Sequence, residues 1–190
     1  DMTEMIQPTG SGVGAFVNGI DLADSLSDNM VGELRNALGE HGVLFFRDQN
    51  ISPEAHMTFA EKFAPINVNR FIAHVDGYPK ITQVLKEPDQ KKNIGGGWHT
   101  DHSYDLDPAL GSILVARDLP ETGGDTLFLN TSDAFDRLSP GFQTMLRLTG
   151  IIPIVVSGDH DGPYVPLRLE VAYHFVESGF HRSIFPGDVL

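Results

Sequence analysis

The sequence predicts an α+β protein in which helices flank a core of short β-strands arranged as a sandwich or barrel, and three observations lead to this prediction. The 190 residues are 41% hydrophobic and 21% charged, which is the composition of one globular domain that can bury a core. Short apolar runs bounded by glycine and polar residues recur along the chain, as strands and turns do. Apolar residues at helical spacing, with capping residues before them, lie between those runs.

The first half of the chain is expected to alternate strands and helices. Strands are predicted in GVGAFVNGIDLAD (12–24), VLFFRDQ (43–49) and KITQVLK (80–86). Ser27 or Asp28 can cap a helix that ends before Gly42. Its apolar positions at helical spacing are Met30, Val31, Leu34, Ala37 and Leu38. Ser52 and Pro53 begin another helix that runs to Phe63. His41 and His56 are expected on the surfaces of these helices.

The second half is expected to hold more strands and two further helices. GSILVARDL (111–119), DTLFLN (125–130) and IIPIVV (151–156) have the apolar character of strands. TSDAFDRL (131–138) and SPGFQTMLRLTG (139–150) are predicted helices, and the second begins at Ser139 and Pro140 and ends at Gly150. The tail after residue 156 has little periodicity, apart from the apolar stretch VAYHFV (171–176), which contains His174.

Charge and composition exclude several classes of function. The net charge is −13 at pH 7, and such a surface repels phosphate backbones, so nucleic acid is not expected as a partner. The chain has no cysteine, which excludes disulfide scaffolds, zinc–thiolate sites and thiol nucleophiles and is compatible with a cytoplasmic enzyme. No apolar run is long enough to cross a membrane, and the first residues do not have the pattern of a signal peptide.

The stretch GGGWHTDHSYD (95–105) is the strongest chemical signal in the sequence. On a strand, residues two apart point to the same face, so His99 and Asp101 would present an imidazole and a carboxylate together, while His102 would point away. One more histidine would complete the two-His-one-carboxylate arrangement that binds Fe(II) and leaves positions open. The alternative is an ordinary polar turn whose histidine and aspartate face water.

Several motifs in order resemble the taurine dioxygenase and TfdA-like family of Fe(II)/2-oxoglutarate-dependent dioxygenases. They are HGVLFFRDQ (41–49), WHTD (98–101), GSILVARDLP (111–120), GGDT (123–126) and AFDRLSPGFQTMLRLTG (134–150). The resemblance covers roughly residues 10–150. It implies a double-stranded β-helix core (a jelly-roll, cupin-like fold) with flanking helices, in one dioxygenase domain over residues 1–190. Too few residues follow Thr126 to complete that fold, so the C-terminal part is expected to be incomplete and residues 151–190 fragmentary.

The same resemblance implies roles for individual residues. His99 and Asp101 correspond to the first two iron ligands, and the catalytic chemistry belongs to the metal centre rather than to further residues. Thr126 corresponds to the hydroxyl that hydrogen-bonds the distal carboxylate of 2-oxoglutarate. Candidates for the third ligand are His160, His174 and His181, of which His174 is preferred because it precedes an arginine.

The C-terminal tail admits two alignments with the family. FHRSIFPGD (180–188) resembles an element that places Arg182 near the cosubstrate carboxylate, as a bidentate partner. FPGDVL (185–190) instead resembles the strand that precedes the distal histidine, in which case the chain ends before that ligand. The first alignment is preferred.

The implied reaction is hydroxylation of a small, anionic organic substrate by O2, coupled to oxidative decarboxylation of 2-oxoglutarate to succinate and CO2. Asn69 or Arg70 lies where some relatives contact substrate, whereas Gly95, Gly96 and Gly97 stand where sulfonate-oxidising relatives carry an asparagine, which argues against taurine itself. Dimers and tetramers are common in the family, so a homo-oligomer is also expected. Two alternatives stay open: a non-oxidative metal-dependent enzyme of the cupin type, and a degenerate, non-catalytic binding protein.

Overall fold

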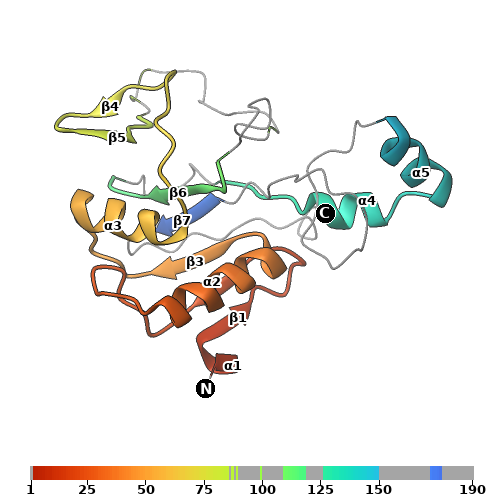
Figure 1. Ribbon diagram of the computed structural model, residues 1–190, viewed down its shortest axis with the longest axis horizontal. Helices are drawn as coiled ribbons and strands as arrows, with labels where there is room; N and C mark the ends of the chain where they lie inside the picture. Colours follow the sequence, from red (N-terminus) through yellow and green to blue (C-terminus); the bar gives the residue numbers. More distant parts are fainter. Residues whose placement is uncertain are drawn as a thin grey trace.

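A computed structural model describes residues 2–85, 87, 89, 99, 109–118, 126–149 and 172–176. These residues form a mixed α/β arrangement with one five-stranded sheet, one two-stranded hairpin and helices beside both (Figure 1). The described residues show a mixed α/β arrangement, and the double-stranded β-helix core that the family resemblance implies stays a prediction. The strand expected at 151–156 lies outside the described residues.

The last strand that the structure describes, β7, lies inside the main sheet and not at its edge. The order is β1-β2-β3-β7-β6, so β7 pairs in parallel with β3 on one side and with β6 on the other. The β2–β3 pair is also parallel, and only β1 runs antiparallel to its neighbour. The strands are β1 (Ile6–Pro8), β2 (Ala15–Val17), β3 (Leu44–Arg47), β6 (Ser112–Val115) and β7 (Ala172–Val176).

Two capped helices cover one side of this sheet. The helix α2 (Asp28–His41) begins after Ser27, whose hydroxyl accepts a hydrogen bond from the Met30 N–H at 3.2 Å. It ends at Gly42, where a φ of +76° turns the chain and the N–H bonds the Leu38 carbonyl. The helix α3 (Pro53–Phe63) begins in the same way after Ser52. Both predicted helices are confirmed, and Ser27 is the cap of the first.

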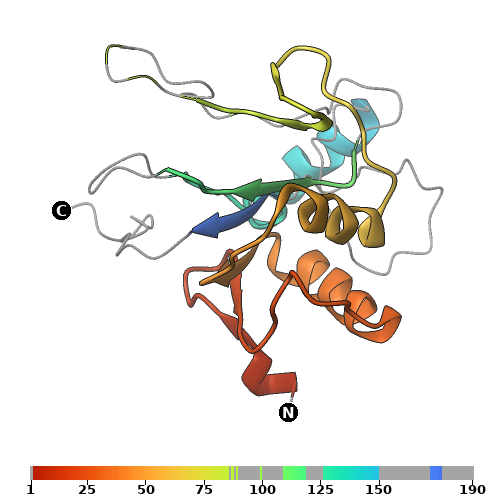
Figure 2. The same ribbon diagram turned by 90° about the vertical axis from the view of Figure 1, so that its left-hand side faces the viewer.

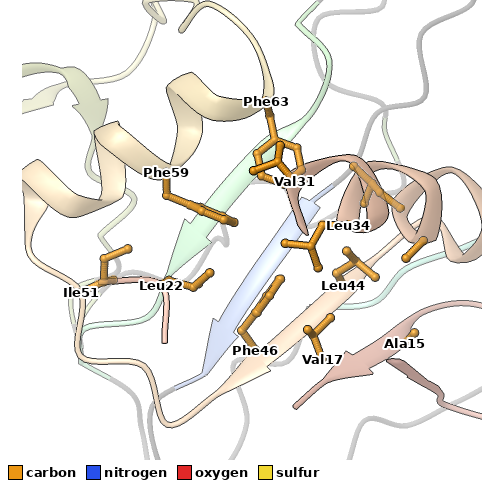
Figure 3. Packing of buried hydrophobic residues seen from close by; sticks show 12 residues of the cluster. Ala15, Val17, Leu22, Val31, Leu34, Leu44, Phe46, Ile51, Phe59 and Phe63 are labelled. Carbon is orange, nitrogen blue, oxygen red and sulfur yellow. The ribbon is translucent and has the colours of Figure 1, made fainter. Parts of the chain in front are cut away.

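The core lies between α2, α3 and one face of β2 and β3. Leu44 and Phe46 of β3 are fully buried, whereas Phe45 between them is only half-buried, so the strand turns alternate residues to the core and to the other face. The Phe46 ring meets the Phe59 ring of α3 edge to face, with centroids 6.1 Å apart. Figure 3 shows Phe46 and Leu44 directed toward the side chains of the two helices.

A separate hairpin packs on the outer side of α3. It consists of β4 (His74–Val75) and β5 (Tyr78–Thr82), and Gly77 has the positive φ that its turn requires. The predicted strand at 80–86 is therefore displaced, because it begins at Tyr78 and ends at Thr82. Tyr78 hydrogen-bonds Glu54 of α3, and Lys80 pairs with Glu61 at 2.6 Å. These two contacts hold the hairpin against the helix.

The helices α4 (Thr131–Asp136) and α5 (Pro140–Thr149) lie together beside one end of the main sheet, as the views in Figures 1 and 2 agree. Both were predicted, but the strand expected at 125–130 is wrong for the residues that the structure describes. Residues 126–130 have no strand pairing and lead directly into α4. The apolar residue Phe128 makes a side-chain contact instead, because its ring packs on the Phe45 ring.

The short elements α1 (Met2–Met5), β1 and β4 have no counterpart among the predicted elements. Each is too short for a periodic pattern to distinguish it from a loop. Their pairing explains them instead: β1 forms because Ile6 and Gln7 find Val17 and Phe16 of β2 opposite them.

Candidate metal centre

One row of residues crosses the whole main sheet and contains the candidate third ligand. The backbone register aligns Gln7, Phe16, Phe45, His174 and Leu114 across the five strands. Phe45 alternates with the buried residues Leu44 and Phe46, so this row lies on the sheet face directed away from α2 and α3. Position 174 is therefore central in the sheet, on the face that the helical layer leaves open.

The segment that carries Thr126 reaches the same face of the sheet. Phe128 lies two residues after Thr126, and its ring centroid is 6.1 Å from that of Phe45, at an interplanar angle of 68°. The Thr126 side chain itself is exposed. The Phe45–Phe128 contact thus brings the Thr126 segment to the sheet face on which Phe45 lies, and the backbone of Phe45 is in register with position 174.

The other predicted site residues are only partly described. His99 is described, and its side chain is exposed. Asp101 and Arg182 lie outside the described residues, as do His160 and His181. Within the described parts of the chain, no three His, Asp or Glu side chains lie close enough to hold a metal ion. The iron centre of His99, Asp101 and His174 therefore stays a prediction.

The donor set of that predicted centre matches the chemistry of Fe(II). Two imidazole nitrogens and one carboxylate oxygen suit this ion, and the sequence has no cysteine thiolate to compete for it. The position of residue 174 in a strand that pairs on both sides provides one rigid anchor for such a centre.

His56 is a half-buried titratable group, so its expected position on a helix surface is wrong. It is half-buried between α3 and β6, where the Ile113 backbone hydrogen-bonds its ring. Burial lowers the pKa of His56, the Ile113 contact partly opposes this, and the positive charge of Arg117 lowers it further. The spacing of His56, Phe59 and Phe63 on one helical face was the signal that could have placed it inward.

Arg117 continues the same contact between α3 and β6. Its Nη2 donates a hydrogen bond to the Ile51 carbonyl at 2.7 Å, immediately before α3 begins. A hydrogen bond from a charged donor is a strong form of this interaction. Together His56 and Arg117 fasten β6, one of the two strands paired with β7, to the helical layer.

Asn69 and Arg70, which are expected where some relatives contact substrate, make local contacts in the structure. The Asn69 side-chain oxygen accepts hydrogen bonds from the Phe71 and Ile72 N–H groups, at 2.8 and 3.0 Å, and so closes a turn. The Arg70 guanidinium lies over the Phe71 ring at 5.4 Å. Neither contact involves the sheet face described above.

An open groove of about 380 Å³ lies between α3 and the hairpin, and its lining comes from these two elements. Two polar pairs border it, Tyr78 with Glu54 and Lys80 with Glu61. The Tyr78 hydroxyl donates to the Glu54 carboxylate and is the main cause that lowers the pKa of Glu54, while the same bond raises the pKa of Tyr78. The acidic groups of this groove are thus already paired within the chain.

Comparisons with known proteins converge on one family. Residues 5–166 match the family described as "Taurine catabolism dioxygenase TauD, TfdA family". The chain is 33% identical over 151 residues to the alpha-ketoglutarate-dependent sulfonate dioxygenase of Saccharomyces cerevisiae, covering 74% of this chain and 36% of that protein. It is 36% identical over 129 residues to an alkylsulfatase of Acinetobacter baylyi, covering 66% of this chain and 39% of the relative.

A solved structure gives the same answer for the fold. The taurine dioxygenase of Burkholderia xenovorans superposes with a TM-score of 0.58 at 31% identity, over 74% of this chain and 50% of that one. The chain therefore spans about a third to a half of the length of these relatives. Among the helices that the structure describes, none is both long and apolar enough to span a lipid bilayer.

Proposed function

We propose that this chain, which belongs to the taurine catabolism dioxygenase TauD, TfdA family, is part of an Fe(II)- and 2-oxoglutarate-dependent dioxygenase. The observation that carries the proposal is the family match over residues 5–166, which includes His99, Asp101 and Thr126 in their motifs. The arrangement of the described residues supports it, since position 174 and the Thr126 segment lie on one face of the sheet.

In this proposal each site residue has a separate task. His99, Asp101 and His174 would hold the metal, which when bound activates O2 for oxidation of the substrate and cosubstrate. The Thr126 hydroxyl donates a hydrogen bond to the distal carboxylate of 2-oxoglutarate. Arg182 pairs with the same carboxylate through two N–H groups, which fixes its orientation as well as its charge.

The proposed substrate is a small organic anion, and the product is its hydroxylated form. Two relatives are named for sulfonates and for alkyl sulfates, which share a small anionic group. The protein surface is itself strongly negative, so attraction of such a substrate must come from cations close to the site. We further propose that residues 1–190 belong to one domain with a double-stranded β-helix core, and that the protein forms a dimer or tetramer.

Anaerobic absorption spectroscopy tests the metal centre directly. Fe(II) and 2-oxoglutarate together should give a weak charge-transfer band in the visible region, because the keto acid chelates the iron. Asp101→Ala and His99→Ala should abolish the band, while His74→Ala, a histidine of the hairpin, should retain it. An intact band in Asp101→Ala would contradict the ligand assignment, and absence of any band or metal binding in the wild type would favour a non-catalytic protein.

A second experiment tests the proposed role of Thr126. Thr126→Val keeps the size and branching of the side chain but removes its hydroxyl, so the wild-type hydrogen bond to 2-oxoglutarate is lost. The dissociation constant for 2-oxoglutarate, titrated by the same band, should rise by about three- to tenfold, and the saturated band should keep its intensity. Thr131→Val, in α4, is the matched control. Unchanged affinity in Thr126→Val would remove Thr126 from the cosubstrate site.

A further inference from the structure

We infer that Phe45 and Phe128 are positioning residues that hold Thr126 over the sheet face where 2-oxoglutarate binds, an inference that rests on the proposed function. Phe45 lies in β3, and its backbone is in register with His174 of β7. Phe128 lies two residues after Thr126. The contact between the two rings therefore connects the rigid sheet to the segment that carries the cosubstrate hydroxyl.

The geometry of the ring contact is that of a specific aromatic pair. The centroids of Phe45 and Phe128 are 6.1 Å apart and the ring planes meet at 68°, which is the favourable edge-to-face arrangement. Phe128 is half-buried, whereas Thr126, Leu127 and Leu129 on the same segment are exposed. Phe128 is thus the residue of 126–129 that is directed most toward the sheet.

Phe45 is itself held firmly enough to act as an anchor. Its ring packs against Phe16 of β2, with centroids 5.5 Å apart, and the Arg47 guanidinium covers the Phe16 ring. Gly14 approaches the ring from the preceding turn so closely that a Cβ there would lie 2.7 Å from Phe45 Cε2. The orientation of Phe45 is therefore limited on two sides by β2 and by the turn before it.

The segment of Thr126 is not placed by membership of a strand. Residues 126–130 precede α4 as described and are assigned to no strand, so side-chain packing contributes to their position. A hydroxyl that must meet a carboxylate tolerates only a small displacement before the hydrogen bond weakens. Packing of Phe128 on Phe45 restricts that displacement without contacting the cosubstrate.

The test compares Phe45→Leu and Phe128→Leu with Phe142→Leu, at an exposed position of α5, as the matched control. Each change keeps an apolar side chain, but only the first two remove the ring pair between the sheet and the Thr126 segment. We expect the dissociation constant and the KM for 2-oxoglutarate to rise by about two- to tenfold in both, with kcat close to the wild-type value. Phe142→Leu should leave both constants at the wild-type value.

Hydrogen exchange gives a readout that does not depend on metal or cosubstrate. Amides of a peptide that covers residues 126–130 should exchange faster in Phe45→Leu and Phe128→Leu, while a peptide from α2 should exchange as in the wild type. Because Phe128 lies outside the sheet, Phe128→Leu decides the question if Phe45→Leu does not fold. Wild-type exchange and wild-type affinity in a folded variant would overturn the inference.

The two proposals fail in different ways. If the wild type does not bind 2-oxoglutarate, the proposed function fails, and the exchange of 126–130 still shows whether the ring pair orders the segment. If the wild type binds 2-oxoglutarate and neither leucine variant changes its affinity, Phe45 and Phe128 are not positioning residues, and the proposed function stands.

Discussion

Gly14 determines how Phe45 packs on the sheet face directed away from α2 and α3. Gly14 is buried, has a φ of +85°, and leaves the space that the Phe45 ring occupies. The two residues lie in separate predicted strands, 31 positions apart, and no sequence pattern indicates that they are in contact. Only the parallel pairing of β2 with β3 brings the turn before one strand to the ring on the other.

Gly14→Ala should therefore destabilise the protein by about 2–4 kcal/mol, because a strained backbone and a steric overlap with Phe45 act together. Gly19→Ala is the matched control, since Gly19 also has a positive φ but nothing within 4 Å of the added Cβ. It should cost only the backbone strain, about 1 kcal/mol. Urea unfolding of both variants measures the difference. Equal losses of unfolding free energy would show that the Phe45 ring moves away easily.

His56 should make the stability depend on pH. Burial lowers its pKa in the folded protein below the usual histidine value of about 6.5, so the unfolded chain binds the proton more tightly. The stabilisation is present above about pH 6.5 and is lost as the pH falls toward the folded pKa. His56→Gln, which keeps a side-chain donor for the Ile113 carbonyl, should unfold with a smaller loss of stability between about pH 7.5 and pH 5.5.

His74→Gln, which leaves His56 in place, is the control and should retain the fall in stability at low pH. Urea midpoints measured at both pH values give the comparison. A wild-type fall in His56→Gln would assign the pH dependence to other groups.

At the scale of elements, prediction from sequence succeeded where the signal is local. The helices α2 and α3 follow from capping residues and apolar spacing that lie within the elements themselves. The strand predicted at 125–130 failed because an apolar run becomes a strand only if a neighbouring strand pairs with it. Here Phe128 makes a ring contact instead. His56 was misplaced for a related reason, since its burial depends on β6, which the sequence alone does not position.

The cap of α2 allows a quantitative test of the local signal. Ser27→Ala removes the oxygen that accepts from the Met30 N–H, so it should lower the free energy of unfolding by about 1 kcal/mol. Ser25→Ala, two residues earlier in the exposed approach to the helix, should change it by less than about 0.5 kcal/mol. If Asp28 took over the cap, the two variants would be equally stable in thermal unfolding.

At the scale of the whole molecule, contiguous motifs can be recognised in the sequence, whereas the order of the strands in the sheet cannot be predicted from it. The family motifs identified the predicted ligands His99 and Asp101, because they form a short contiguous pattern. The position of His174 beside Phe45 could not be predicted, because it depends on a parallel pairing between β3 and β7, which are far apart in the sequence. Such non-local pairing leaves no periodic signal in either segment.

Truncation can show that this last strand completes the sheet. A chain that ends after residue 171 lacks β7, so β3 and β6 lose their shared partner and each exposes a row of unpaired backbone groups. A chain that ends after residue 176 keeps the strand. The shorter chain should unfold at a lower urea concentration than the longer one, and it should associate more in sedimentation. Its loss of unfolding free energy should exceed the about 2–5 kcal/mol of a single large-to-small substitution in a core.

The longer truncation also separates fold from function. A chain of residues 1–176 retains all five strands but lacks Arg182, the proposed partner of the 2-oxoglutarate carboxylate. It should therefore keep a cooperative unfolding transition and bind 2-oxoglutarate about tenfold or more weakly than the whole chain, since a bidentate charged pair is lost. The affinity of Arg182→Lys in the whole chain should lie between those two, because lysine keeps the charge but not the paired donors.

Equal affinity for 2-oxoglutarate in all three chains would remove Arg182 from the cosubstrate site. Equal stability of the chains that end at 171 and 176 would remove β7 from the sheet.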